Sequence, residues 1–406
     1  MNQIDRRHVE TLIRESRGIL ALDPTWVTRD FLPAGHRLGL DDYAVEDKRR
    51  GEIAERWLGS TTIADNPFGP KDEGLSYIHC EDGSRILFRD AVSVAGDLLL
   101  GKDQFQKYGG ITMFTKLFDY AAPIPFHLHQ MKQHVQPLGK GPKDEAYYFP
   151  EGVPTGNFPF TFFGVHPSLA LPENRSKLIS YIERWETDEI LKFSRAYKLV
   201  PGEGFFVPSG TLHAPGTALT LEIQEASDVF AMLQGIAGGR SISRDHLWKD
   251  VDPRVRQKND LLSILDLINW ETSGDPYFYE NYHTSEILID GSRQAGGEEY
   301  WIFYGSTKFS GKKCVVRPGR SLDCREHGAF TVLVWRGEGK FAERVTRAGA
   351  ERAHTRDELF VCYDAATRPH TIRNTGSSDL TLFKLFGPTV NTDTPVLSHY
   401  PQSGPT

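Results

Sequence analysis

Residues 111–130 read ITMFTKLFDYAAPIPFHLHQ, two short runs rich in aromatic and β-branched residues with prolines between them. Similar runs follow, each bounded by Gly or Pro: EAYYF at 145–149, GFFVP at 204–208 and TALTLEIQ at 217–224. Many short strands separated by turn signals are typical of a β-sandwich or β-barrel. The sequence therefore predicts a mainly β fold.

The strand-rich pattern occurs in two blocks. A second block runs from about 284 to 388, after a polar segment at 271–282 that reads as a hinge. Helical periodicity is predicted near 6–16, 45–58, 173–192 and 259–269. We expect a helical segment at 1–58 packed on the first barrel, a first barrel at 59–270 with a helical insertion, a second barrel at 283–390 and a tail at 391–406.

Composition excludes several classes of protein. The 406 residues carry 47 basic and 54 acidic side chains, a net charge of −7, with no basic block that could follow a phosphate backbone. We therefore expect no nucleic-acid partner.

The compartment is indicated by the cysteines and the apolar segments. Four scattered cysteines favour free thiols in a reducing compartment. The N-terminus is charged throughout, and no apolar run approaches the roughly 20 residues that span a bilayer, so a cytoplasmic protein without a membrane partner is expected.

A metal site is the first chemistry that the residues suggest. His127 and His129 lie in a strand-like run, and because strand side chains alternate, both imidazoles point to one face. Glu145 opens the next strand, and His213 follows a Pro-Ser-Gly turn. Three imidazole nitrogens and one carboxylate oxygen suit Zn, Fe, Mn or Ni about equally. His134, in a polar stretch, is a rival third ligand.

Several motifs, in this order and spacing, resemble the metal-binding core of a type I phosphomannose isomerase, an enzyme family of the cupin superfamily. The motifs are ERWLGSTTIADNP at 55–67, GDLLLG at 96–101, MFTKLFDYAAPIPFHLHQ at 113–130, GKGPKDEAYYF at 139–149, FTFFGVHPSLALPE at 160–173, PGEGFFVPSGTLHAPG at 201–216 and LEIQEASDVF at 221–230. The likeness covers about 50–240 and, more dimly, the second block. It implies a bicupin, two β-barrel or jelly-roll domains with additional helices.

The resemblance implies that His127, His129, Glu145 and His213 hold one divalent metal ion, with zinc expected before Mn, Fe or Ni. The family usually has Gln at the first of these positions, so His127 is a departure. The second barrel has no HxH motif and is expected to bind no metal.

The resemblance also implies two residues that act on the substrate. Lys143 matches a family lysine two places before the glutamate ligand. Glu222 matches the family's candidate acid/base carboxylate, and strand alternation places it on the polar face of TALTLEIQ with Thr220 and Gln224.

One expected substrate-binding residue is missing. The family's arginine should lie near Ala231 or Met232, and this sequence has none there. Arg240 and Arg244, in the following segment, are the candidates to replace it in substrate binding. Without a guanidinium, a phosphate loses a bidentate partner, so an unphosphorylated substrate comes into consideration.

The function that these residues predict is metal-dependent aldose–ketose isomerisation of a mannose-like sugar or sugar phosphate through an enediol. Two alternative functions are compatible with the same four metal ligands: a bicupin metal-dependent dioxygenase and a non-catalytic sugar-binding bicupin. The expected partner is a small sugar, and the sequence leaves the oligomeric state open.

Overall fold

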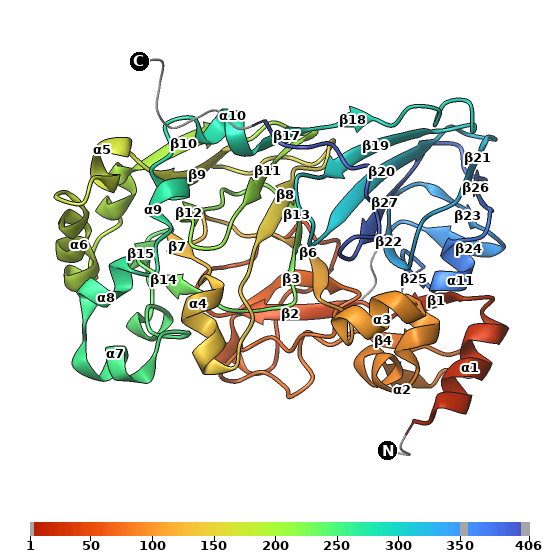
Figure 1. The fold of residues 1–406 in the computed structure, drawn as a ribbon, viewed down its shortest axis with the longest axis horizontal. Helices are drawn as coiled ribbons and strands as arrows, with labels where there is room; N and C mark the ends of the chain where they lie inside the picture. The colour runs from red at the N-terminus through yellow and green to blue at the C-terminus, as the bar shows by residue number, and fades with distance from the viewer. Residues whose placement is uncertain (1–3, 350–355, 399–406) are drawn as a thin grey trace.

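The computed structural model of the chain describes residues 4–349 and 356–398. Antiparallel sheets dominate, with short helices around them (Figure 1). The mainly β fold predicted from the sequence is confirmed. The last part of the predicted tail, 399–406, lies outside the described residues. Within the described part, no helix is both long and apolar enough to cross a membrane.

Two sheets build the first β-rich region, and aromatic residues from both share one core cluster. The seven-stranded sheet has the order β17 (His283–Ser285), β11 (Glu203–Val207), β8 (Glu145–Tyr148), β13 (Thr220–Glu225), β6 (Met113–Phe118), β3 (Glu52–Leu58) and β2 (Thr25–Arg29). The five-stranded sheet has the order β10 (Ser194–Lys198), β9 (Phe160–Val165), β12 (His213–Ala214), β7 (His127–Leu128) and β14 (Ala231–Met232). Phe163 of β9 packs on Phe205 of β11, with ring centroids 4.7 Å apart, and so joins the two sheets.

Two further sheets build the second β-rich region, drawn mainly in blue in Figure 1. The nine-stranded sheet has the order β18 (Ile287–Leu288), β19 (Glu298–Phe303), β20 (Ser310–Val316), β27 (Leu380–Phe386), β22 (Phe330–Arg336), β25 (Glu358–Val361), β1 (Ile19–Leu22), β4 (Tyr77–His79) and β5 (Arg85–Leu87). The four-stranded sheet has the order β21 (Ser321–Cys324), β26 (His370–Asn374), β23 (Glu338–Phe341) and β24 (Arg344–Arg347). A small hairpin pairs β15 (Ile236–Ala237) with β16 (Arg240–Ser241).

The helices are short and lie around the sheets (Figure 1). They are α1 (Arg6–Glu15), α2 (Phe88–Leu100), α3 (Lys102–Tyr108), α4 (Lys132–Val135), α5 (Pro167–Ala170), α6 (Ile179–Arg184), α7 (Pro253–Lys258), α8 (Leu261–Leu265), α9 (Trp270–Ser273), α10 (Phe278–Tyr282) and α11 (Tyr363–Ala366). Helical structure is confirmed at the predicted segments 6–16, 173–192 and 259–269, where α1, α6 and α8 lie among short 3-10 turns. In α1, Asp5 caps the first turn by accepting a hydrogen bond from the backbone N–H of His8.

The predicted helix at 45–58 is wrong, because the second half of this segment is β3 and the first half holds only a short 3-10 turn at Lys48–Arg50. Its charged residues read as the solvated face of a helix, but the two in the middle of β3, Glu55 and Arg56, are buried in ion pairs. Glu55 lies 3.2 Å from Arg29, and Arg56 lies 2.8 Å from Asp357. Because both faces of β3 are buried, the sequence lacks the alternation of apolar and polar residues that marks a half-buried strand.

The predicted packing of the N-terminal helix on the first barrel is also wrong. Strand β1 pairs with β25 of the second region, with Ile19 opposite Val361. Val9 of α1 then packs in one cluster with Phe360 and Cys362. Figure 1 accordingly shows α1, α2 and α3 grouped beneath the nine-stranded sheet.

The predicted hinge at 271–282 is folded into the core. It forms α9 and α10, and Phe278 is fully buried with its ring 5.2 Å from that of Phe163. The polar residues that suggested a hinge are used locally. Asp275, for example, accepts a hydrogen bond from the Asn281 side chain at 2.7 Å.

Candidate active site

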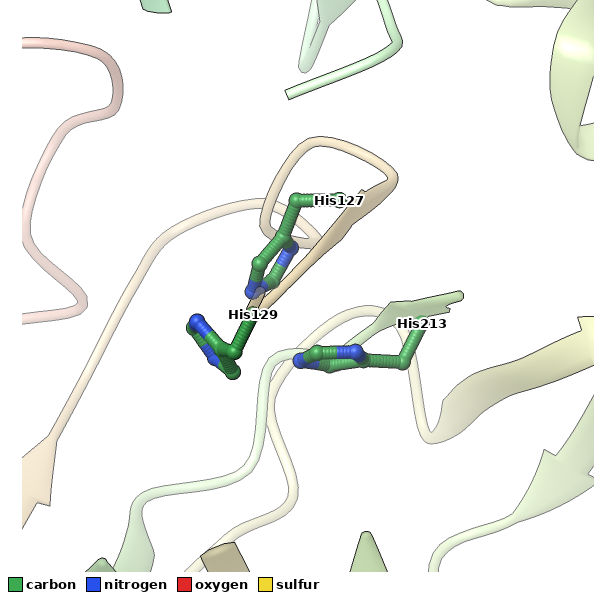
Figure 2. Close-up of side chains that lie close together, drawn as sticks. All are labelled: His127, His129 and His213. Carbon is green, nitrogen blue, oxygen red and sulfur yellow. The ribbon is translucent and has the colours of Figure 1, made fainter. Parts of the chain in front are cut away.

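The five-stranded sheet brings three histidines together. His213 of β12 is the direct cross-strand partner of His127 of β7, and His129 follows one residue after the end of β7. Figure 2 shows the three imidazole rings turned toward one another. Their nitrogen ligand atoms all lie within 4.8 Å of one another, and all three side chains are buried.

Each imidazole is oriented by a backbone carbonyl. The oxygens that accept from Nδ1 belong to Pro125 for His127 (2.7 Å), Val229 for His129 (2.7 Å) and Thr211 for His213 (2.8 Å). A carbonyl can only accept, so Nδ1 carries the proton and the lone pair of the neutral ring is on Nε2. Burial keeps two of the rings neutral: it lowers the pKa of His127 well below its usual value and that of His129 to about 3. Neutral imidazoles with a fixed tautomer are the form that binds metal ions.

Glu145 supplies the fourth donor group from β8, in the facing sheet. Its Oε2 lies 3.0 Å from Nε2 of His129, and its Oε1 lies 3.1 Å from Nε2 of His213. The Tyr147 hydroxyl donates to the same carboxylate. Burial would raise the pKa of Glu145, but the charge of Lys143, together with the contacts to His129 and His213, outweighs it and holds that pKa well below 4.5.

The donor set fits a divalent metal ion. Among the described residues, Nε2 of His213 has no hydrogen-bond partner although it is buried, and it faces a carboxylate oxygen that carries only lone pairs. Two acceptor atoms held this close repel each other unless a cation lies between them. Three imidazoles and one carboxylate match the ligands preferred by zinc and by other first-row metal ions.

Glu222 lies beside this group, between two lysines. One carboxylate oxygen is 3.2 Å from Nζ of Lys143 and the other is 3.3 Å from Nζ of Lys116, its cross-strand partner on β6. Lys143 also reaches Glu145 at 2.9 Å and Nε2 of His129 at 3.0 Å. Burial, and then the negative charge of Glu145, raise the pKa of Glu222 to about 8 despite the two lysines. A carboxyl group with this pKa exchanges protons near neutral pH.

Further charged residues lie beside this group, and the sequence did not predict them there. Arg29 of β2 and Asp228 form an ion pair of 2.8 Å, and Arg29 also contacts Glu55 at 3.2 Å. The Tyr120 hydroxyl donates to Glu55 at 2.6 Å. The only sequence signal for this group was a charged residue inside an otherwise apolar strand, as with Lys116 in MFTKLF.

Three residues singled out in the sequence do not join the site. Arg240 is exposed in β16, whereas Arg244 donates to the carbonyl of Glu183 at 3.0 Å and lies over the Trp185 ring. Neither arginine lines the cavity next to the histidines. The rival ligand His134 lies in α4, outside the histidine group. The substrate-binding role expected for the two arginines stays a prediction.

A small cavity of about 40 Å³ adjoins the histidines. This volume holds a metal ion with one or two waters. Its polar lining residues are Arg29, Glu55, Lys116, Tyr120, His127, His129, Lys143, Glu145, Tyr147, Glu222 and Asp228, and its apolar ones are Phe31, Ile124, Pro215, Phe230 and Met232. The lining thus combines charged groups that can move protons with apolar side chains.

Comparison with known proteins identifies the class of fold. No family model matches the chain. A stretch of 84 residues is 49% identical to mannose-6-phosphate isomerase ManA of Bacillus subtilis, over 20% of this chain and 22% of that protein. The chain thus matches about a fifth of this relative's length.

Solved structures match over nearly the whole chain. A variant of phosphomannose isomerase from Salmonella typhimurium superposes with a TM-score of 0.60, at 14% identity, over 91% of this chain and 100% of that one. Mannose 6-phosphate isomerase from Bacillus subtilis gives a TM-score of 0.58, at 16% identity, over 91% and 99%. The chain has the fold of the phosphomannose isomerases, and the resemblance that its sequence indicated is confirmed.

Proposed function

We propose that the protein is a metal-dependent aldose–ketose isomerase that acts on a mannose-like sugar or sugar phosphate through an enediol. The observation that carries the proposal is the juxtaposition of two groups. A buried cage of three Nε2 atoms and the Glu145 carboxylate adjoins a second carboxylate, Glu222, which two lysines hold in place. The fold shared with phosphomannose isomerases supports the same reading.

The proposed metal ligands are His127, His129, Glu145 and His213, with one divalent ion, zinc before Mn, Fe or Ni. When bound, such an ion polarises carbonyl and hydroxyl oxygens of a sugar as a Lewis acid. We propose no ion for the second β-rich region.

The proposed base is Glu222. Isomerisation needs a group that removes a proton from the carbon next to the carbonyl and returns it to the neighbouring carbon, with no net oxidation. A carboxyl group with a pKa near 8, held between Lys116 and Lys143, suits both directions of this transfer. Lys143 has the position to donate hydrogen bonds to sugar oxygens, where developing negative charge would strengthen them.

We also propose that the two β-rich regions are the two cupin domains of a bicupin, at 59–270 and 283–390. Each region is built mainly from two antiparallel sheets, which supports this division. Strand β1, and strands β4 and β5 from within 59–270, would then complete the second domain.

The test is an isomerisation assay on the full chain with mannose, fructose, lyxose and their phosphates, with metal content measured alongside. His129→Ala should lose both the metal and turnover, whereas the matched control His134→Ala should keep both. Sugar binding without turnover by the metal-loaded protein would favour the non-catalytic bicupin. Metal-dependent oxygen consumption would favour the dioxygenase.

A further inference from the structure

We infer that the Tyr147 hydroxyl positions the Glu145 carboxylate as a metal ligand and thereby sets how tightly the ion binds. This role rests on the proposed function, which takes Glu145 and the three histidines as the ligands of one divalent ion. Tyr147 is not itself a ligand in this arrangement. It acts through the carboxylate to which its hydroxyl donates a hydrogen bond.

Strand β8 places the two side chains on the same face of its sheet. Glu145 and Tyr147 are two residues apart, and strand side chains alternate, so both point toward the facing sheet that carries the histidines. Tyr148 points the other way and packs on Phe303 and Phe383 of the second region. The phenol of Tyr147 therefore reaches the carboxylate directly from the regular geometry of the strand.

The core holds the Tyr147 ring in place. The residue is 1% exposed, and its main chain pairs on one side with β11 and on the other with β13. Its ring centroid lies 5.7 Å from that of Phe118, 6.1 Å from that of Phe163 and 6.3 Å from that of His213. The position of the hydroxyl is thus set by packing around the ring.

The hydrogen bond from Tyr147 fixes a carboxylate that is otherwise weakly oriented. Oε1 of Glu145 accepts this bond, and the same oxygen lies 3.1 Å from Nε2 of His213. Oε2 has no hydrogen-bond partner among the described residues, although it lies 3.0 Å from Nε2 of His129 and 2.9 Å from Nζ of Lys143. Because the last torsion of a glutamate side chain is soft, a single bond from a fixed hydroxyl decides which way the carboxylate faces.

A bound ion is compatible with this hydrogen bond. Each carboxylate oxygen has two lone pairs, so Oε1 can accept from the hydroxyl with one and face a cation with the other. The hydroxyl is neutral, and a neighbouring cation does not repel it as it would repel the ammonium of Lys143. That ammonium is also shared, because it lies 3.2 Å from Glu222 and 3.0 Å from Nε2 of His129. Tyr147 is therefore the partner that can hold Glu145 while the ion is bound.

The experiment frees the full chain of metal with a chelator and titrates it with zinc. Tyr147→Phe keeps the ring and its packing but removes the hydroxyl, so the Kd for zinc should rise about 10- to 100-fold, the usual effect of losing such a bond to a ligand. Tyr148→Phe is the matched control: it removes a buried hydroxyl from the next residue, which donates to Glu286 instead. Its Kd should equal that of the wild type. An unchanged Kd in Tyr147→Phe, or an equal rise in both variants, overturns the inference.

A second readout follows the ligand geometry. The visible absorption bands of bound Co²⁺ depend on how its ligands are arranged, so Tyr147→Phe should shift them and Tyr148→Phe should not. Thermal unfolding of the metal-free proteins checks that both variants fold. Bands that stay the same in Tyr147→Phe would show that Glu145 keeps its position without the hydroxyl, and this result would also overturn the inference.

Two further outcomes separate the role of Tyr147 from the proposed function. A wild-type chain that binds no divalent ion overturns the proposed metal site itself, and the role of Tyr147 falls with it. Unchanged zinc affinity in Tyr147→Phe, with turnover lost at saturating zinc, would place the hydroxyl on the substrate. That result overturns the inference and leaves the isomerase standing.

Discussion

His127 and His213 are direct cross-strand partners, with ring centroids 4.0 Å apart, where β7 meets β12. These are two-residue strands, so the pairing of the sheet and the spacing of the two imidazoles are the same structural feature. A ligand that binds both rings therefore also holds the two strands together. Metal binding and folding of this sheet should be thermodynamically linked.

Metal removal should lower stability. Bound metal at about 100 times its Kd would add about 2.7 kcal/mol to the free energy of unfolding, so a chelator should lower Tm and added zinc should restore it. Calorimetry on the full chain measures the shift. His213→Ala should show no response to chelator or zinc, whereas His134→Ala should respond as the wild type does. A Tm that is the same with and without chelator, while the metal is shown to leave, would contradict the prediction.

Glu222→Gln should lower kcat by about 10²- to 10⁴-fold, the usual contribution of a general base. KM and metal content should change little, because Glu222 is not among the proposed ligands and the amide keeps its volume. Glu225→Gln is the matched control: it makes the same chemical change on the same strand, β13, at a residue that does not line the cavity. Equal losses of kcat in the two variants would argue against Glu222 as the base.

The histidine pair was predictable because it depends on local geometry. Alternation along one strand places His127 and His129 on one face, and a turn precedes His213. The partners of the site were less visible. Lys116 is a single charge within an apolar strand, Glu55 lies next to Arg56 in β3, and only the pairing of β3, β6 and β13 brings Lys116 and Glu55 to the cavity.

The errors in the predicted fold arise from contacts between residues far apart in the sequence, which local patterns do not indicate. Ile19 pairs with Val361, and no local pattern near residue 19 indicates this partner. Arg56 in β3 is likewise neutralised by Asp357 and Glu358, at the start of β25. Its charge therefore suggested a solvated helix, although the side chain is only 2% exposed.

Arg56→Met should destabilise the protein by about 3–5 kcal/mol, because it leaves buried carboxylates without their partner. Both oxygens of Asp357 accept from Arg56 at 2.8 Å, and Glu358 accepts at 3.0 Å. Arg49→Met is the control, since its pair with Asp47 is largely exposed, and it should change stability by about 0.5 kcal/mol or less. Denaturant titration measures both values. A loss for Arg56→Met as small as that for Arg49→Met would show that the pair contributes little between the two regions.

Glu358 should make stability depend on pH. Burial raises its pKa to about 7 from an ordinary value of 4.5, although Arg56 and the backbone N–H of Gly59 favour the ionised form. The folded protein thus binds this proton more tightly than the unfolded chain, so the stabilisation is fully present below pH 4.5 and is lost as pH rises through 7. The loss amounts to about 3 kcal/mol at most.

The variant Glu358→Gln tests this. Because Gln does not titrate, the difference in unfolding free energy between wild type and Glu358→Gln should shift in favour of the variant from about pH 5 to about pH 8. Denaturant titrations across this range measure it, and parallel pH curves for the two proteins would show that Glu358 does not titrate there.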